Sequence, residues 1–144
     1  MPSSLKSAVR SSDPLDWFIN LSGHTVIDAP LKENKSFSIE GADASCYIVL
    51  SNQLLGAERR TCLGHELGHC EYAGFYTEDT PYELRSRKEY RANTWAFFVL
   101  APPDDVKKAL KLGYTEPWEL ADWFGITEEF MKKAFSYYKM QNLI

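Results

Sequence analysis

Long apolar runs are missing from this sequence of 144 residues. No stretch approaches the roughly 20 apolar residues that cross a bilayer, so we expect no membrane span. Residues 1–7 hold no apolar signal-peptide core, which favours a cytoplasmic protein. Cysteine is scarce: Cys46, Cys62 and Cys70 cannot all pair within one chain, and their spacing matches no all-cysteine zinc site. We therefore expect reduced thiols.

An excess of positive charge is also missing. The formal net charge is −4, which disfavours broad, sequence-independent binding to nucleic acid. The 44% hydrophobic and 25% charged residues are typical of a globular protein. The length favours a single domain over residues 1–144, with a core at 13–103 and a helical extension at 104–144 packed on it.

Histidine is rare, yet two of the three histidines stand together in His65-Glu66-Leu67-Gly68-His69. On a helix, positions i and i+4 share one face, so both imidazoles can bind one divalent ion. Glu66 is then placed as a general base beside that ion, as a zinc hydrolase requires. The alternative is a surface helix that carries these residues by chance. For His24, on a predicted strand, a structural role is favoured over metal ligation.

Residues 83–100 predict a second helix, ended by Pro102-Pro103. Glu89 lies three residues before Ala92 on its inward face, where a carboxylate is costly unless it is paired or binds metal. We therefore favour Glu89 as the third ligand. A salt bridge is the alternative for Glu89, with partners among Arg85, Arg87, Lys88 and Arg91.

The other candidate ligands fit less well. Cys62 shares the helix face of His65 and His69, but a small packing residue is the commoner role. Four acids lie on the wrong face, in a predicted loop over residues 75–82, or at a helix start: Glu71, Glu78, Asp79 and Glu83.

The remaining patterns predict an α+β fold. A helix begins at Asp13-Pro14 and ends at Gly23. Residues 24–28, 37–40 and 46–50 predict a small, mostly antiparallel three-stranded sheet. We expect the last of these strands at the sheet edge, where an extended substrate can add to it. We expect the helix that carries His65 and His69 to span residues 57–72. Gly64 and Gly68 lower the stability of a helix, so their presence predicts that the sheet or a second helix approaches closely along that line.

The C-terminal third has helix-turn-helix spacing. Residues 104–112 predict a short helix, and Ala121, Gly125 and Ala134 stand at the positions of a helix-turn-helix unit. The helix that would read DNA begins with Glu128 and Glu129, which repel phosphate. We therefore interpret this segment as a packing or docking unit and expect no direct nucleic-acid binding.

Two linked segments resemble the ImmA/IrrE family of metallo-endopeptidases. One is Glu58-Arg-Arg-Thr-Cys-Leu-Gly-His65-Glu66-Leu-Gly-His69, and the other is Glu89-Tyr-Arg-Ala92-Asn93 and the residues to Pro102. The resemblance is close over residues 44–103. Many members read E-x-E-A-N, whereas Arg91 replaces the second acid here, which leaves Glu89 as the available ligand.

The resemblance implies a compact zincin-like (gluzincin-type) fold with a small sheet on the HExxH helix. It also implies cleavage of helix-turn-helix repressors, in bacteria, prophages and integrative elements. Together, the resemblance and the residues named above predict a zinc-dependent endopeptidase in which His65, His69 and Glu89 bind Zn²⁺. Mn²⁺ or another divalent ion also suits such a site. Four tyrosines are candidates to stabilise the oxyanion: Tyr72, Tyr76, Tyr82 and Tyr90.

Two other classes of protein remain open. The first is a non-catalytic protein-binding module stabilised by its metal, although a structural metal site needs no base such as Glu66. The second is a DNA-binding regulator that acts through residues 115–140.

Overall fold

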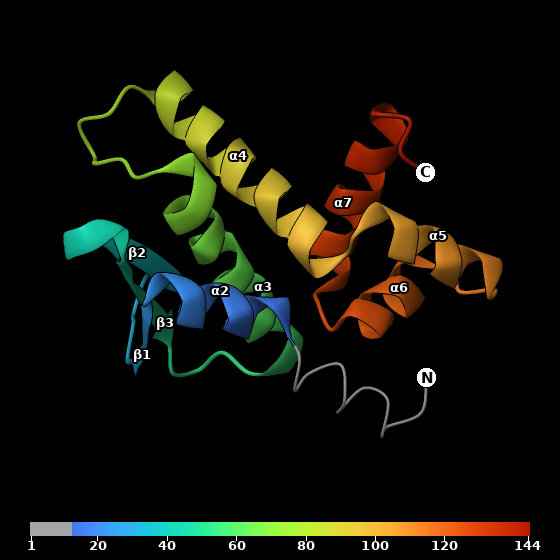
Figure 1. Cartoon of the computed structure of the whole chain (residues 1–144), viewed down its shortest axis with the longest axis horizontal. Coiled ribbons are helices and arrows are strands. Elements are labelled where there is room, and N and C mark those ends of the chain that lie inside the picture. Colours follow the sequence, from blue (N-terminus) through green and yellow to red (C-terminus); the bar gives the residue numbers. More distant parts are fainter. Residues whose placement is uncertain (1–12) are drawn as a thin grey trace.

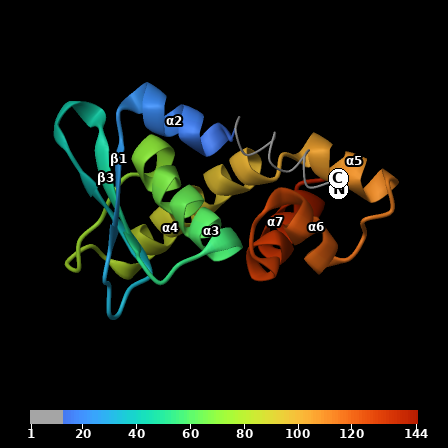
Figure 2. The same ribbon diagram turned by 90° about the horizontal axis from the view of Figure 1, so that it is seen from below.

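The computed structural model describes residues 13–144. Within them the fold is α+β, with six α-helices and one three-stranded sheet, as predicted (Figure 1). The sheet lies at one end of the molecule, α3 and α4 lie in the middle, and α5, α6 and α7 gather at the other end (Figure 2). In the described part of the chain, no helix combines the length and apolar character needed to cross a membrane.

The first described helix, α2 (Pro14–Ser22), begins and ends at the predicted residues. The Asp13 side chain accepts a hydrogen bond from the Leu15 amide at 3.0 Å. Gly23 ends the helix in the left-handed conformation, with φ of 71°. Leu15 is buried and joins the core.

The sheet consists of β1 (Thr25–Ala29), β2 (Ser36–Glu40) and β3 (Cys46–Ser51), in the order β1-β3-β2. β2 pairs antiparallel with β3, while β1 pairs parallel with β3, so the sheet is mixed where mostly antiparallel pairing was expected. β3 is the central strand, so its prediction as the edge strand was wrong. Its alternate residues Cys46, Ile48 and Leu50 are buried, which a strand covered on one face and paired on both sides requires.

The motif helix α3 (Gly56–Gly68) continues as one π-helical turn, η2 (His69–Ala73). Gly74 ends it with φ of 78°, as the sequence predicted. A loop leads to α4 (Tyr82–Leu100), which packs along α3. A Cβ on Gly68 would overlap the backbone of Ala92, so the predicted close approach occurs, and the partner is the second helix.

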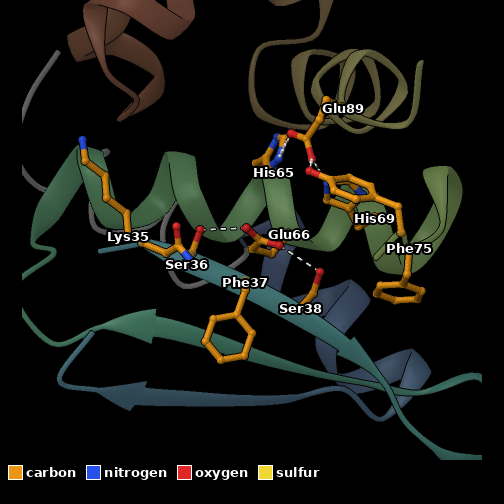
Figure 3. A pocket seen from close by; sticks show the side chains of 11 residues that line it. Lys35, Ser36, Phe37, Ser38, His65, Glu66, His69, Phe75 and Glu89 are labelled. Atoms are coloured by element: carbon orange, nitrogen blue, oxygen red, sulfur yellow. Dashed lines mark hydrogen bonds and ion pairs between the residues drawn. The ribbon is translucent and has the colours of Figure 1, made fainter. Parts of the chain in front are cut away.

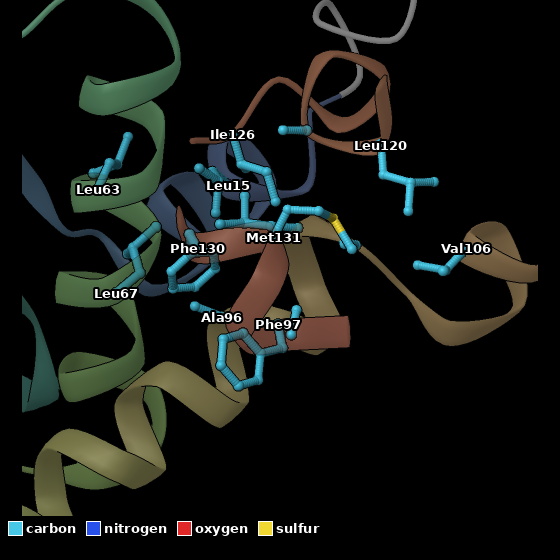
Figure 4. Packing of buried hydrophobic residues seen from close by; sticks show 14 of the residues in the cluster. Leu15, Leu63, Leu67, Ala96, Phe97, Val106, Leu120, Ile126, Phe130 and Met131 are labelled. Carbon is cyan, nitrogen blue, oxygen red and sulfur yellow. The ribbon is translucent and has the colours of Figure 1, made fainter. Parts of the chain in front are cut away.

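The C-terminal helices are α5 (Pro103–Lys111), α6 (Pro117–Phe124) and α7 (Glu128–Met140). They bury Val106, Leu120, Phe130 and Met131 in the same cluster as Leu63 and Leu67 of α3 (Figure 4). Thr127 begins α7 by accepting a hydrogen bond from the Phe130 amide at 3.2 Å.

Arg60 ties three parts of the chain together. Its guanidinium pairs with Asp13 at 2.9 Å and also donates to the carbonyl of Phe124, at the end of α6. Both side chains of the pair are largely buried. The basic residue just before the motif therefore joins α2, α3 and α6.

Candidate metal centre

His65 and His69 lie on one face of α3 and its π-helical continuation, as the i, i+4 spacing requires. Their ring centroids are 4.9 Å apart and the rings are nearly perpendicular. His69 is buried and His65 is partly exposed. The face they share opens into a cleft of about 410 Å³ between α3, β2 and α4 (Figure 3).

Glu89 reaches both histidines from α4. One carboxylate oxygen lies 2.8 Å from His65 Nε2 and the other lies 2.9 Å from His69 Nε2. The three side chains each offer one ligand atom within 4.8 Å of the others, so they could hold one metal ion. Glu89 makes no ion pair with a Lys or Arg among residues 13–144, so the alternative of a salt bridge to its basic neighbours is wrong.

Hydrogen bonds to Nδ1 set the orientation of both imidazoles. His65 Nδ1 lies 2.7 Å from Asn93 Oδ1, and His69 Nδ1 lies 2.8 Å from the Gly74 carbonyl oxygen. A carbonyl oxygen only accepts, so each Nδ1 carries the proton and donates it. In this structure each Nε2 faces a Glu89 oxygen and donates to it. A metal ion would take the place of that proton while Nδ1 keeps its own, which is the usual arrangement of metal-binding histidines.

The charges of the site shift two pKa values in opposite directions. Burial lowers the pKa of His65, but the hydrogen bond with Glu89 and the charge of Glu66 outweigh it and raise that pKa above 6.5. Burial raises the pKa of Glu89, but hydrogen bonds from His65, His69 and Tyr76 bring it well below 4.5. The site thus favours an ionised Glu89, which is the form that binds a cation.

Glu66 is buried between α3 and β2. Ser36 Oγ donates to one of its carboxylate oxygens at 2.7 Å and Ser38 Oγ donates to the other at 2.8 Å (Figure 3). The two serines are two residues apart on β2, so both face the helix. Both hydroxyls thus hold the carboxylate at the floor of the cleft.

Tyr76 is the one tyrosine of the four candidates that lines this cleft. Its hydroxyl donates to Glu89 Oε1 at 2.7 Å, and its ring centroid lies 6.1 Å from that of His69. Burial and the hydrogen bond to Glu89 raise the pKa of Tyr76 to about 12, so the hydroxyl keeps its proton at neutral pH.

Two cysteines lie beside the candidate metal centre, and they are bonded to each other. Cys46 and Cys70 form a disulfide with their Cα atoms 6.0 Å apart, so the expectation of reduced thiols was wrong for them. Sequence spacing did not reveal the pair because it joins β3 to η2, 24 residues apart. Cys62 stays free and outside the ligand group, and burial raises its pKa, which disfavours the thiolate that binds metal.

His24 lies next to the disulfide and has a structural role, as favoured from the sequence. Its Nδ1 accepts a hydrogen bond from the Cys46 amide at 2.9 Å, and its Nε2 lies 3.3 Å from Glu71. A neutral imidazole has one lone pair, and the amide occupies it. His24 therefore has no lone pair left for a metal.

Several residues that position the proposed ligands and the proposed base were not predicted from the sequence. Asn93 lies four residues after Glu89, so the i, i+4 rule could have placed it on the same helix face. Ser36 and Ser38 alternate on a strand, which puts them on one face, but the sequence does not say that this face meets α3. The Gly74 carbonyl depends on the π-helical turn, which has no signal in the sequence.

A small sheet beside a helix that carries HExxH, with a carboxylate supplied by the next long helix, is the arrangement of an HExxH metallopeptidase. Comparison with protein-family models matches residues 21–136 to the IrrE N-terminal-like domain, peptidase family M78. The chain belongs to this family, the ImmA/IrrE metallopeptidases, as its motifs indicated. Comparison with curated proteins gives no match.

Proposed function

We propose that the protein is a zinc-dependent endopeptidase in which His65, His69 and Glu89 hold the metal. The convergence of both Nε2 atoms on the Glu89 carboxylate, at 2.8 and 2.9 Å, supports this assignment most strongly. Two imidazoles and one carboxylate suit Zn²⁺, with a position left for water. Zn²⁺ bound there would lower the pKa of that water to about 7 and polarise the scissile carbonyl.

Glu66 acts as the general base and then as the general acid. Its carboxylate accepts the proton of the attacking water and delivers it to the leaving amine. Each carboxylate oxygen has two lone pairs, so the hydrogen bonds from Ser36 and Ser38 leave one on each oxygen for this proton. The serines thus hold the base in place without blocking it.

Tyr76 is our candidate for stabilising the oxyanion. Its hydroxyl lies in the cleft and keeps its proton, so it can turn from Glu89 to the negative oxygen that develops on the substrate. The Tyr76→Phe variant is then expected to keep its metal and lose turnover. Unchanged turnover in that variant would show that Tyr76 does not stabilise the oxyanion.

The substrate is proposed to lie along β2. This strand lines the cleft and, in the described part of the chain, pairs only with β3, so its other edge offers backbone groups to an added strand. The family resemblance favours a helix-turn-helix repressor as the protein that is cut.

A cleavage assay with a matched variant tests the proposal. The zinc-loaded protein and its Glu66→Gln variant are each incubated with a helix-turn-helix repressor as candidate substrate, and products are identified by mass spectrometry. We expect cleavage by the natural protein, loss of cleavage in Glu66→Gln, and equal zinc in both. Equal cleavage by the two proteins contradicts the mechanism, and no cleavage by either, at full zinc content, favours the non-catalytic binding module.

A further inference from the structure

A second groove runs along α4 from Ser86 to Phe97, with Tyr72 of η2 at one end and α7 along the other. α7 lies beside the C-terminal part of α4 (Figure 1). It consists of two hollows of about 530 and 510 Å³ that share Tyr90 and Tyr137 as lining residues. None of its lining residues lines the metal cleft. We call it the α4–α7 groove.

The charge of this groove is opposite to that of the whole protein. Among residues 13–144, four cationic side chains line it and no carboxylate does, although the net charge of the chain is −4; the four are Arg87, Arg91, Lys132 and Lys133. Arg87 and Arg91 are exposed and make no ion pair with any residue of 13–144. The two lysines face Glu128 and Glu129 at 3.6 and 3.7 Å, in exposed pairs that contribute little.

The floor and rim of the groove are aromatic and apolar. The ring centroids of Tyr90 and Tyr137 are 6.2 Å apart, and those of Phe97 and Tyr137 are 5.8 Å apart. Met140, at the rim, is 68% exposed. Arginine and tyrosine beside apolar side chains are the composition of protein-binding surfaces.

The groove and the metal centre share structural elements. Asn93 lines the groove, and its side chain also holds His65 at 2.7 Å. Tyr90 directly follows the proposed ligand Glu89 on α4. Tyr72, which lines the other end of the groove, lies three residues after His69 in η2. A chain seated in the groove would therefore lie beside the cleft in which it is cut.

We propose that the α4–α7 groove binds an acidic segment with aromatic or aliphatic side chains, which belongs to the protein substrate and lies outside the bond that is cut. The acidic character of the partner follows from charge complementarity with Arg87 and Arg91, which have no carboxylate partner among residues 13–144, and its apolar side chains follow from the apolar floor. This proposal rests on the proposed endopeptidase function for the identity of the partner. Nucleic acid fits less well, because a phosphate backbone that pairs with the cations would leave the apolar floor unfilled.

The test measures binding, so it does not depend on hydrolysis. The full chain with Glu66→Gln is titrated into a fluorescein-labelled synthetic peptide of alternating glutamate and phenylalanine, and anisotropy gives the Kd. The test variant adds Arg87→Glu and Arg91→Glu. The control variant adds Lys107→Glu and Lys111→Glu instead, which makes the same charge change at the same spacing on exposed positions of α5. A further variant, Tyr90→Ala, removes an aromatic contact without a change of charge.

We expect the arginine reversals to raise the Kd at least about tenfold and Tyr90→Ala to raise it severalfold, while the α5 control changes it less than about twofold. An equal rise in both charge-reversal variants overturns the proposal, because binding would then depend only on net charge. Absence of binding overturns it as well. Tighter binding of a duplex oligonucleotide, lost with the same arginines, would instead assign the groove to nucleic acid.

Failure here is distinguishable from failure of the endopeptidase function. If the groove binds no peptide, the zinc-loaded natural protein can still be tested for cleavage, so the endopeptidase proposal stands or fails by its own assay. If the protein cleaves nothing, the binding measured with Glu66→Gln remains valid.

Discussion

Ser38 on β2 donates a hydrogen bond of 2.8 Å to Glu66 on α3, and so joins one edge strand of the sheet to the proposed general base. Ser36 makes the matching bond to the other carboxylate oxygen. A buried carboxylate held from both sides has a defined position before substrate arrives. This relationship makes β2 both the proposed site of substrate addition and the support of the proposed general base.

The double variant Ser36→Ala/Ser38→Ala is expected to lower kcat by about tenfold or more, because hydrogen bonds to a charged group contribute about 1.5–3 kcal/mol. Zinc content should stay at the natural level, since neither serine is a proposed ligand. Restoring the hydroxyls with threonine should recover most of the rate. Ser45→Ala is the control, because its hydroxyl bonds to the Ala42 carbonyl away from Glu66. A natural kcat in the double variant would show that the serines do not position the base.

The two glycines of α3 should respond differently to alanine. A Cβ on Gly68 would meet the backbone of Ala92, with the Cα atom at 2.9 Å, whereas a Cβ on Gly64 would meet the end of the Leu100 side chain. Leu100 can move but the Ala92 backbone cannot, so Gly68→Ala should cost about 3 kcal/mol of unfolding free energy and Gly64→Ala much less. Urea unfolding of the metal-free variants measures both. Equal losses of unfolding free energy in the two variants would mean that the close contact between Gly68 and α4 does not determine the cost of the added methyl group.

The disulfide should stabilise the fold. It closes a loop over a sequence separation of 24 residues, which corresponds to about 3.5 kcal/mol in the chain-entropy account. Addition of a reductant should therefore lower the urea midpoint of the natural protein. The Cys46→Ser/Cys70→Ser variant should show the lower urea midpoint without reductant, and addition of reductant should not change it. A reductant effect of the same size in that variant would assign it to something other than this pair.

Tyr138 joins the C-terminal helices to the rest of the core. Its hydroxyl is buried and donates to the Ala101 carbonyl at 2.7 Å, and burial raises its pKa above the ordinary 10.0. A raised pKa means that the folded state resists ionisation, so stability is fully present below pH 10 and is lost as the pH rises through the folded pKa.

Tyr138→Phe should lose about 1 kcal/mol at neutral pH and show less of this alkaline decline. Unfolding followed by far-ultraviolet circular dichroism against pH measures both effects. A single transition in each case is what the prediction of one domain over residues 1–144 requires. An alkaline decline of the natural size in the variant would assign it to another group.

The sequence predicted the elements of this fold better than their arrangement. Local signals such as Asp13-Pro14, Gly23 and Gly74 determine where helices begin and end, and they were interpreted correctly. The order of the strands depends on contacts between distant segments, so β3 was wrongly assigned to the edge of the sheet.

The candidate site divides in the same way. Helical periodicity was enough to bring His65, His69 and Glu89 together, because each spacing is local to one helix and the two helices share apolar faces. The hydroxyls of Ser36 and Ser38 and the partner of Cys46 come from tertiary packing, for which one sequence holds no local signal.

Metal content tests the central assignment most directly. Elemental analysis after zinc loading would compare the natural protein with His65→Ala and Glu89→Ala, and with Glu71→Ala as a neighbouring carboxylate outside the proposed ligand set. We predict about one zinc per natural chain and per Glu71→Ala chain, and a loss of most of it in His65→Ala and Glu89→Ala. Full zinc in a folded Glu89→Ala protein, or none in the natural protein, would contradict the proposed ligand set.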